Sequence, residues 1–410
     1  MQEVLSNPKH LHMSHQHQII IVGGGNAGIS TASQLLRKNR KLDIAVIEPS
    51  EKHYYQPAFT LVGAGVFNMK NTIHQEKDVM PKGVNWIKQK VVSFQPEQNS
   101  ITLDNQETLS YQYLIVAPGI QLNWNEIKGL KETLGKNGVC SNYSVEHVPY
   151  TWECISQFKG GKALFTNPNT PVKCGGAPHK IMWLAADYFK KHGVFEKADI
   201  QYWSGGTRLF GVEKYEKTLK KVAERDHVQM NFFTKLVEID GPNKKAKFVG
   251  FGEQNKDKEY WVDFDMIHVT PPQSAPDFIR NSPLANTAGW VDVDKHSLQH
   301  NKYPNVFSLG DASSLPTSRT GAAIRKQAPV LVKNLLAVME GKKPEASYNG
   351  YTSCPVVTGY GKLVLCEFDY NNQPIETFPF DQGKERWSMY QLKRRVLPWL
   401  YWNKILPGKM

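Results

Sequence analysis

The segment that most constrains the fold is residues 19–28 (IIIVGGGNAG), where four β-branched residues lead into a Gly-x-Gly-x-x-Gly pattern and then a helical pattern. Gly23 permits a tight turn, Gly25 lets a pyrophosphate approach the backbone, and Gly28 lets the helix pack on the strand. A second apolar run ends at Glu48, twenty residues after Gly28. A carboxylate there can bind ribose hydroxyls, so we expect a dinucleotide-binding domain rather than an ordinary glycine-rich turn.

The chain has 410 residues, which is too many for one small core, so two or three domains are expected. No apolar run approaches twenty residues, which argues against a membrane-spanning helix. The net charge of +12 could attract nucleic acid, an anionic membrane or a small anion. No nucleic-acid-binding motif accompanies the charge, so we expect no nucleic-acid partner. Five widely spaced cysteines favour neither a disulfide framework nor a metal site.

The first seventeen residues are polar and include four histidines. A solvated tail explains them better than a metal-binding cluster. They show neither a signal-peptide nor a transit-peptide pattern.

A second α/β unit is expected from a strand at 162–166, a turn containing Cys174, and a helix from Pro178 to about Lys190. A domain that binds NADH would carry its own glycine fingerprint at this turn, and none is present. The second unit therefore has the outline of a dinucleotide domain without a nicotinamide site.

Two more strands are expected to belong to the first dinucleotide-binding unit. A strand at 113–119 ends in Gly119, and a later apolar strand ends in Asp311 before a helix at about 320–340. Asp311 is either a helix cap or a ligand for a polyol or ribityl group. Together with Glu48, the cofactor interpretation is favoured.

These patterns predict an α/β fold with two Rossmann-type domains and a C-terminal region. The expected segments are a polar tail (1–17), a first FAD-binding segment (18–125), a second Rossmann-like domain with Cys174 (126–290), a second FAD-binding segment (291–345) and a C-terminal region for redox, quinone and membrane contact (346–410).

The stretch from Glu385 to Leu406 mixes tryptophan, tyrosine and leucine with lysine and arginine. This composition is typical of a helix lying on a bilayer surface. The alternative is a helix docked on its own domain or on a second subunit. Pro398 is expected to break or kink the helix.

A dinucleotide site without a nicotinamide partner suggests FAD reduced by something other than NADH. Cys174 and Cys354 each lie in a turn beside glycine or proline, and a helix N-terminus and Lys173 would favour the Cys174 thiolate. If the fold brings the two together, a sulfur nucleophile can open their disulfide, leave a persulfide on one cysteine and deliver two electrons to the flavin. Inert burial suits the other cysteines better: Cys140, Cys154 and Cys366.

The chain resembles the sulfide:quinone oxidoreductases, most closely their mitochondrial-type (type II) branch. The motifs that carry this resemblance are 48–57 (EPSEKHYYQP), 141–144 (SNYS), 169–178 (NTPVKCGGAP), 268–272 (HVTPP), 289–294 (GWVDVD), 315–318 (LPTS), 351–355 (YTSCP) and 376–381 (ETFPFD). The resemblance implies a glutathione-reductase-like fold, FAD, oxidation of hydrogen sulfide, and ubiquinone or menaquinone as acceptor. In the family, another amphipathic segment follows the part that this chain matches, so the strength of membrane attachment is left open, whereas the quinone chemistry is not affected.

By the same resemblance, Cys174 and Cys354 are the redox pair, with sulfide attacking Cys354 and Cys174 facing the flavin. Arg319 stands where this branch has a lysine near the flavin. The other implied FAD contacts are Gly23, Gly25, Asn26, Ala27, Gly28, Glu48, Gln56, Val91, Gly119 and Asp311. The implied quinone pocket is formed by Tyr360, Phe378 and Phe380.

The remaining expectations concern partners and location. The sulfur acceptor is open between sulfite, glutathione, coenzyme A, cyanide and polysulfide, and a homodimer is left open. We expect peripheral attachment at the cytoplasmic face of a bacterial inner membrane. Two alternative functions remain: a NADH:quinone oxidoreductase of the same fold, and a flavin-bearing membrane redox sensor without turnover.

Overall fold

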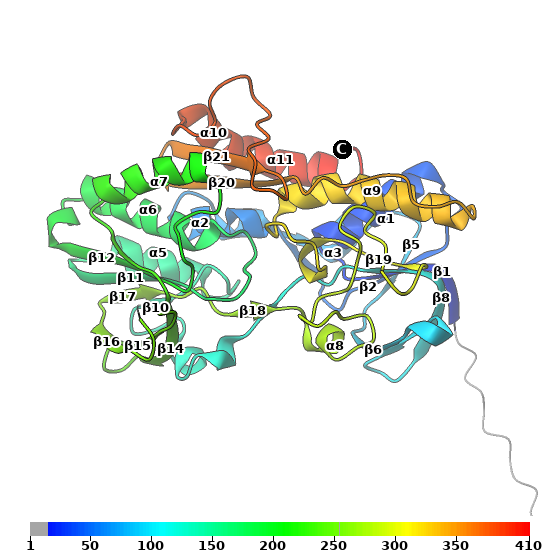
Figure 1. The fold of residues 1–410 in the computed structure, drawn as a ribbon, viewed down its shortest axis with the longest axis horizontal. Coiled ribbons are helices and arrows are strands. Elements are labelled where there is room, and N and C mark those ends of the chain that lie inside the picture. The colour runs from blue at the N-terminus through cyan, green and yellow to red at the C-terminus, as the bar shows by residue number, and fades with distance from the viewer. Residues whose placement is uncertain (1–14, 254) are drawn as a thin grey trace, which may run out of the picture.

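The computed structural model describes residues 15–253 and 255–410 and shows two α/β lobes with the C-terminal region lying across both (Figure 1). The first strand begins at His15, inside the segment expected to be a polar tail. Residues 1–14, including His10 and His12, lie outside the described residues.

The first lobe is built on a seven-stranded sheet of order β5-β2-β1-β8-β7-β6, in which β19 also pairs with β8. Its central strands are parallel, and Val22 lies opposite both Ile47 and Val116, while Val116 lies opposite Ser308. The ends of four strands therefore meet at one edge of the sheet. The strands are β1 (His15–Val22), β2 (Ile44–Ile47), β5 (Val84–Ile87), β6 (Val91–Gln95), β7 (Ser100–Leu103), β8 (Thr108–Val116) and β19 (Val306–Ser308).

Two helices, α1 (Asn26–Lys38) and α9 (Gly321–Met339), pack against each other in this lobe. The last four residues of β1 are buried and apolar, as expected for a parallel strand covered on both faces. Shorter elements complete the lobe: β3 (Lys52–Tyr54), η1 (Gln56–Ala58), α2 (Phe59–Val62), η2 (Met69–Thr72), β4 (Ile73–Gln75), α3 (Glu76–Val79), η3 (Pro96–Gln98), α8 (Asp277–Arg280) and η6 (Gly310–Ala312).

The second lobe has a parallel sheet of order β10-β17-β11-β12-β13 and an antiparallel sheet of order β14-β15-β16. Its strands are β10 (Val139–Cys140), β11 (Gly161–Asn167), β12 (Ala198–Ser204), β13 (Gln229–Asn231), β14 (Thr234–Asp240), β15 (Lys245–Gly250), β16 (Glu259–Asp263) and β17 (Met266–His268). Its helices are α4 (Leu130–Thr133), α5 (Val148–Ser156), α6 (Ala177–Lys191) and α7 (Glu213–Arg225), with η4 (Trp124–Glu126) and η5 (Phe195–Lys197). A small ladder of β9 (Gln121–Leu122) and β18 (Gln273–Ser274) lies between the two lobes (Figure 1).

The C-terminal region begins with an antiparallel hairpin of β20 (Thr352–Gly359) and β21 (Lys362–Phe368). It ends in a helical run from Trp387 to Ile405, made of α10 (Trp387–Gln391), the π-helical η7 (Leu392–Val396), α11 (Leu397–Leu400) and the π-helical η8 (Tyr401–Ile405). The run continues through Pro398, so the expected break does not occur there, while a kink stays a prediction. Pro398 cannot donate a backbone hydrogen bond, and π-helical turns, which interrupt the regular α-helical bonding, flank it on both sides.

Candidate functional site

The glycine turn between β1 and α1 leaves its backbone open. A Cβ added at Gly25 would meet nothing within 4 Å, and the same holds at Gly119. Gly23 has φ +103°, and a Cβ there would lie 2.5 Å from the carbonyl oxygen of Ala117, which follows β8. α1 has no acidic residue in its first turn and no side-chain cap, so its first N–H groups are free for phosphate.

Glu48 is fixed at the end of β2 beside this turn. Its Oε2 accepts a hydrogen bond from Gly24 N–H (2.8 Å), and its Oε1 accepts one from Ser50 N–H (2.8 Å). Burial raises the pKa of Glu48, and the two backbone donors oppose that shift. An open glycine turn, an uncapped helix and an oriented carboxylate are together the donor set that a dinucleotide requires, so the site fits FAD.

A charged corner faces this turn from the end of β19. Burial raises the pKa of Asp311, while Lys173 and Arg319 oppose the shift. Arg319 Nε donates to the carbonyl of Asp311 (2.9 Å), and its guanidinium lies 3.8 Å from the ring centre of Trp290. The backbone carbonyl of Arg319 also accepts from Cys174 N–H (2.7 Å), so this arginine links the Asp311 corner to the cysteine turn.

Three other predicted cofactor residues are placed as follows. Gln56 is exposed in η1, and its Oε1 accepts from Lys173 Nζ. Val91 is buried at the start of β6. Asn26 lies near the start of α9, because a Cβ at Gly321 would be 3.5 Å from Asn26 Nδ2. The contact of each residue with FAD stays a prediction.

The fold brings Cys174 and Cys354 together, although 180 positions separate them: their Sγ atoms are 3.1 Å apart. Cys174 lies in the expected turn before α6, with φ +55°, a left-handed conformation that few non-glycine residues adopt. Cys354 is buried inside strand β20 and not in a turn, contrary to expectation. A Cβ at Gly176 would lie 2.6 Å from Cys354 Sγ, so glycine is needed for this close approach.

Two buried lysines control the charge of this pair. Lys180 Nζ, in the first turn of α6, donates to Cys174 Sγ (3.0 Å), and Lys393 reaches the same region from the C-terminal helix. The Cys354 thiol, followed by Lys180 and Lys393, holds the pKa of Cys174 well below its ordinary value. The hydrogen bond to Cys174, together with burial, raises the pKa of Cys354. Cys174 is therefore the thiolate and Cys354 the thiol.

The sequence did not identify these lysines. Lys173, which we expected to act on Cys174, donates to Gln56 instead. The only signal for Lys180 was a lysine next to the apolar run 181–186. Lys393 stands beside Arg394 and Arg395, and nothing local distinguishes it from them.

The remaining cysteines are less uniform than expected. Cys140 and Cys366 are fully buried, but Cys154 is only half-buried and shares a hydrogen bond with Cys140 that lowers its pKa.

The three residues expected at a quinone site border the apolar core around β20 and β21. Tyr360 donates from its hydroxyl to the carbonyl of Ala64 (2.8 Å). The rings of Phe378 and Phe380 stack with centres 5.3 Å apart. A role in quinone binding stays a prediction.

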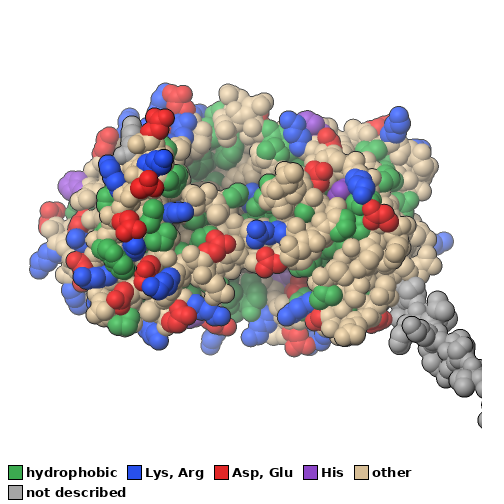
Figure 2. Space-filling view, turned by 60° about the horizontal axis from the view of Figure 1, so that its bottom comes forward, with side chains coloured by type: hydrophobic (Ala, Val, Ile, Leu, Met, Phe, Trp, Pro, Cys, Tyr) green, Lys and Arg blue, Asp and Glu red, His purple; other side chains and the backbone are tan. Residues whose placement is uncertain are grey.

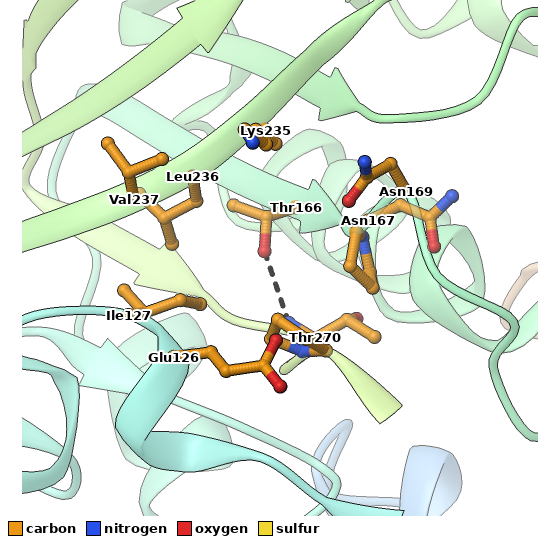
Figure 3. Close-up of a pocket in the computed structure, with 11 residues that line it drawn as sticks. Glu126, Ile127, Thr166, Asn167, Asn169, Lys235, Leu236, Val237 and Thr270 are labelled. Atoms are coloured by element: carbon orange, nitrogen blue, oxygen red, sulfur yellow. Dashed lines mark hydrogen bonds between the residues drawn. The ribbon is translucent and has the colours of Figure 1, made fainter. Parts of the chain in front are cut away.

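The second lobe has a cavity of about 130 Å³ at the ends of β11 and β17 (Figure 3). Thr166 and Asn167 line it from β11, and Thr270 and Pro272 line it after β17, with Thr270 N–H donating to Thr166 Oγ1 (3.1 Å). A doubly wound sheet binds nucleotides at this kind of strand junction. Here the loop that follows β11 carries Cys174 in place of a glycine fingerprint, and it directs the N-terminus of α6 toward the cysteine pair.

Comparison with known proteins agrees with this geometry. The model of the pyridine nucleotide-disulphide oxidoreductase family matches residues 17–148. The chain is 49% identical to the mitochondrial sulfide:quinone oxidoreductase of Dictyostelium discoideum over 96% of this chain and 86% of that protein. It is 45% identical to the mitochondrial enzyme of Mus musculus over 96% of this chain and 87% of that protein.

The chain belongs to the sulfide:quinone oxidoreductase family. Its fold also matches the crystal structure of the sulfide:quinone oxidoreductase from Aquifex aeolicus, with a TM-score of 0.80, 18% identity, and coverage of 95% of this chain and 92% of that one. The predicted fold class is confirmed, and FAD is the cofactor that this family and the open glycine turn indicate. The comparisons favour neither the NADH:quinone oxidoreductase nor the non-catalytic sensor.

The expected place at a bacterial inner membrane is not supported, because the three relatives that are 39% to 49% identical to this chain are mitochondrial by name. Within residues 15–253 and 255–410 no helix is long and apolar enough to cross a bilayer. On the face that carries β14–β16, acidic and basic side chains are interspersed, so the excess positive charge does not gather there (Figure 2).

Substitutions at Gly25 and Gly28 should separate the effect of the turn on cofactor binding from its effect on folding. In Gly28→Ala the new Cβ would lie 1.9 Å from the carbonyl oxygen of Gly23, so we expect destabilisation by about 1–3 kcal/mol. Gly25→Ala should fold normally but lose FAD, because its methyl group enters the open side of the turn. Chemical denaturation, far-UV circular dichroism and the flavin-to-protein absorbance ratio measure both effects. FAD retained at full occupancy in Gly25→Ala would contradict this assignment.

Replacing the cation next to Cys174 should raise the pKa of that cysteine. In Lys180→Met the thiolate loses its hydrogen-bond donor, so we expect alkylation of Cys174 by iodoacetamide to begin at a higher pH than in the unmodified protein. Lys190→Met, on the same helix but bonded to Asp226, is the matched control. An unchanged alkylation profile in Lys180→Met would show that Lys180 does not stabilise the thiolate.

Proposed function

We propose that the chain oxidises hydrogen sulfide at the Cys174–Cys354 pair and passes the electrons through FAD to a quinone. The observation that carries the proposal is the 3.1 Å contact between the two sulfurs, with a buried ammonium 3.0 Å from one of them. The family assignment supplies sulfide as the electron donor and quinone as the acceptor.

The proposed sulfur chemistry at this pair is a thiol–disulfide exchange. In the oxidised pair, hydrosulfide forms a bond to the Cys354 sulfur and breaks the S–S bond, which leaves a persulfide on Cys354 and a thiolate on Cys174. An acceptor nucleophile then removes the outer sulfur and leaves Cys354 as a thiolate. Closing the disulfide again releases two electrons, which FAD, when bound, accepts and passes to the quinone.

The unequal environments of the two sulfurs set the direction of attack. A thiol of lower pKa is the better leaving group in this exchange, and Cys174 has the lowered pKa of the two. Hydrosulfide therefore attacks Cys354, and Cys174 leaves as the thiolate that Lys180 stabilises. Cys354 is fully buried, which favours a nucleophile as small as hydrosulfide at this step.

Lys393 can move a proton at this site. Burial, followed by repulsion from Lys180, lowers the pKa of Lys393 to about 7, so its ammonium and amine forms are both available near neutral pH. Its Nζ also donates to the carbonyl of Pro57 (3.1 Å), which keeps it beside the cysteine site.

The sulfur acceptor is a small nucleophile such as sulfite, glutathione, coenzyme A, cyanide or polysulfide. The two lysines favour an anionic acceptor, because both place positive charge next to the cysteine pair. A homodimer stays a prediction.

The C-terminal helix is the proposed membrane contact. Trp387, Val396 and Trp399 expose 67%, 43% and 53% of their surface, and most other large apolar side chains of the described residues are covered. Lys404 Nζ lies 5.7 Å from the ring centre of Trp399, and Arg395 is exposed. Exposed tryptophans beside cations are typical of a helix that lies in the headgroup region.

Sulfide should bleach the flavin band near roughly 450 nm under anaerobic conditions, and a soluble quinone should restore it. Cys174→Ser and Cys354→Ser should retain FAD but lose this bleaching, because neither can form the disulfide that hydrosulfide opens. Cys366→Ser, opposite Cys354 on β21, is the matched control and should react normally. If NADH bleaches the flavin while sulfide does not, the proposed function is wrong.

Removing the exposed tryptophans should release the protein from membranes. For Trp387→Ser/Trp399→Ser we expect the affinity for phosphatidylglycerol-containing vesicles to fall by about tenfold or more, because two large apolar side chains no longer enter the bilayer. Sedimentation with vesicles measures the change. Trp261 on β16 is about as exposed as Trp399, so Trp261→Ser is the control and should bind as the unmodified protein does. If Trp261→Ser lowered the affinity for vesicles as much, the C-terminal helix would not be the specific membrane-binding face.

A further inference from the structure

Three buried polar side chains, joined by hydrogen bonds, connect the C-terminal helix to the glycine turn of the first lobe. Tyr401 of η8 lies with its hydroxyl 2.6 Å from His53 Nε2, and His53 Nδ1 lies 3.2 Å from Glu76 Oε2. All three side chains are at least 95% buried. None of them takes part in the sulfur chemistry described above.

The chemistry of the three side chains decides which group donates in each of the two hydrogen bonds. The carboxylate of Glu76 can only accept, so His53 Nδ1 carries the proton that faces it and Nε2 accepts from the Tyr401 hydroxyl, which burial keeps protonated by raising the pKa of Tyr401. Each ring nitrogen of His53 therefore has one partner, Glu76 at Nδ1 and Tyr401 at Nε2. Tyr401 therefore fixes the ring orientation of His53, and His53 fixes the carboxylate of Glu76.

Glu76, the last of these three side chains, lies against Gly24 of the glycine turn. A Cβ placed on Gly24 would lie 2.7 Å from Glu76 Oε1 and 2.6 Å from Glu48 Cγ. Gly24 N–H donates to Glu48, so Glu76 packs beside the carboxylate expected to bind the ribose. Glu76 Oε1 is buried and has no hydrogen-bond partner among the described residues. A buried carboxylate oxygen left without a donor is costly, which favours a donor brought by a ligand.

The same helix also packs against the hairpin that carries His53. In the β3–β4 hairpin His53 lies opposite His74, and the ring of His74 stacks on Trp402 with centres 3.8 Å apart and planes 6° apart. The ring of Tyr55 lies 4.7 Å from that of Tyr401. The hairpin is thus held between the C-terminal helix on one side and the glycine turn, through Glu76, on the other.

We propose that His53, Glu76 and Tyr401 are positioning residues that couple docking of the C-terminal helix to binding of the FAD dinucleotide. With the helix docked, Tyr401 and His53 hold Glu76 against Gly24, and Glu48 stays oriented toward the ribose position. Without the helix, His53 and Glu76 are free to turn toward solvent, and the acid that faces the turn is no longer fixed. Because coupling between two sites is reciprocal, FAD strengthens helix docking as much as docking strengthens FAD binding.

Two measurements on the holoenzyme test this coupling. The first measurement is the release of FAD on dilution, which is followed by the rise in flavin fluorescence and gives the dissociation constant for FAD. For Tyr401→Phe and His53→Asn we expect this dissociation constant to rise roughly tenfold, the effect of one buried hydrogen bond. Hydrogen exchange of residues 393–406 is then compared between unmodified protein that has lost part of its FAD on dilution and the same sample resaturated with FAD. Resaturation should slow exchange across the helix, and by less in the two variants.

Tyr390→Phe is the matched control, because it removes a hydroxyl from another buried tyrosine of the same helical run that packs on the second lobe. It should leave FAD release unchanged. The proposal is overturned if both variants loosen the helix yet retain FAD as the unmodified protein does. It is also overturned if resaturation with FAD leaves exchange of residues 393–406 unchanged in the unmodified protein, a result that needs no variant to fold.

Discussion

The hydrogen bond from Lys180 to Cys174 is the interaction on which the functional site depends. Burial alone would lower the pKa of Lys180, but the sulfur of Cys174, followed by that of Cys354, raises it above its ordinary value. The lysine therefore keeps its charge only because a sulfur anion lies 3.0 Å away, and the sulfur keeps its charge because of the lysine. A buried charge needs a partner of opposite sign. The pair is thus a local source of reactivity and a requirement for stable packing at the same time.

The C-terminal helix contributes to both halves of the molecule. Through Lys393 it adds a second cation to the cysteine pair, and through Tyr401 it reaches the buried pair of His53 and Glu76 beside the glycine turn. Its other face exposes Trp387 and Trp399. One helix therefore borders the sulfur site, the cofactor site and the proposed membrane face, although these sites lie on different lobes of the fold.

The sequence predicted those parts of the site that depend on local pattern. Gly25, Glu48 and Asp311 stand at strand ends, and the shared register of the parallel strands brings those ends to one edge. The proximity of Cys174 and Cys354 came from family resemblance, because no local rule joins residues 180 positions apart. Lys180, Lys393 and His53 were missed for a physical reason. A lysine or histidine that becomes buried only when distant segments pack has the same local sequence as one on the surface.

The course of the chain through the first sheet has a consequence for synthesis. β19 pairs with β8 and carries Asp311 at its end, yet the whole second lobe separates these two strands in the sequence. A ribosome must therefore deliver nearly three quarters of the protein before the first sheet can be completed. The second lobe, which is continuous, can fold while β8 still has an unpaired edge. Such non-local pairing is slow to form and prone to aggregate. The edge of β8 that receives β19 therefore stays exposed until β19 has been synthesised and has paired with it.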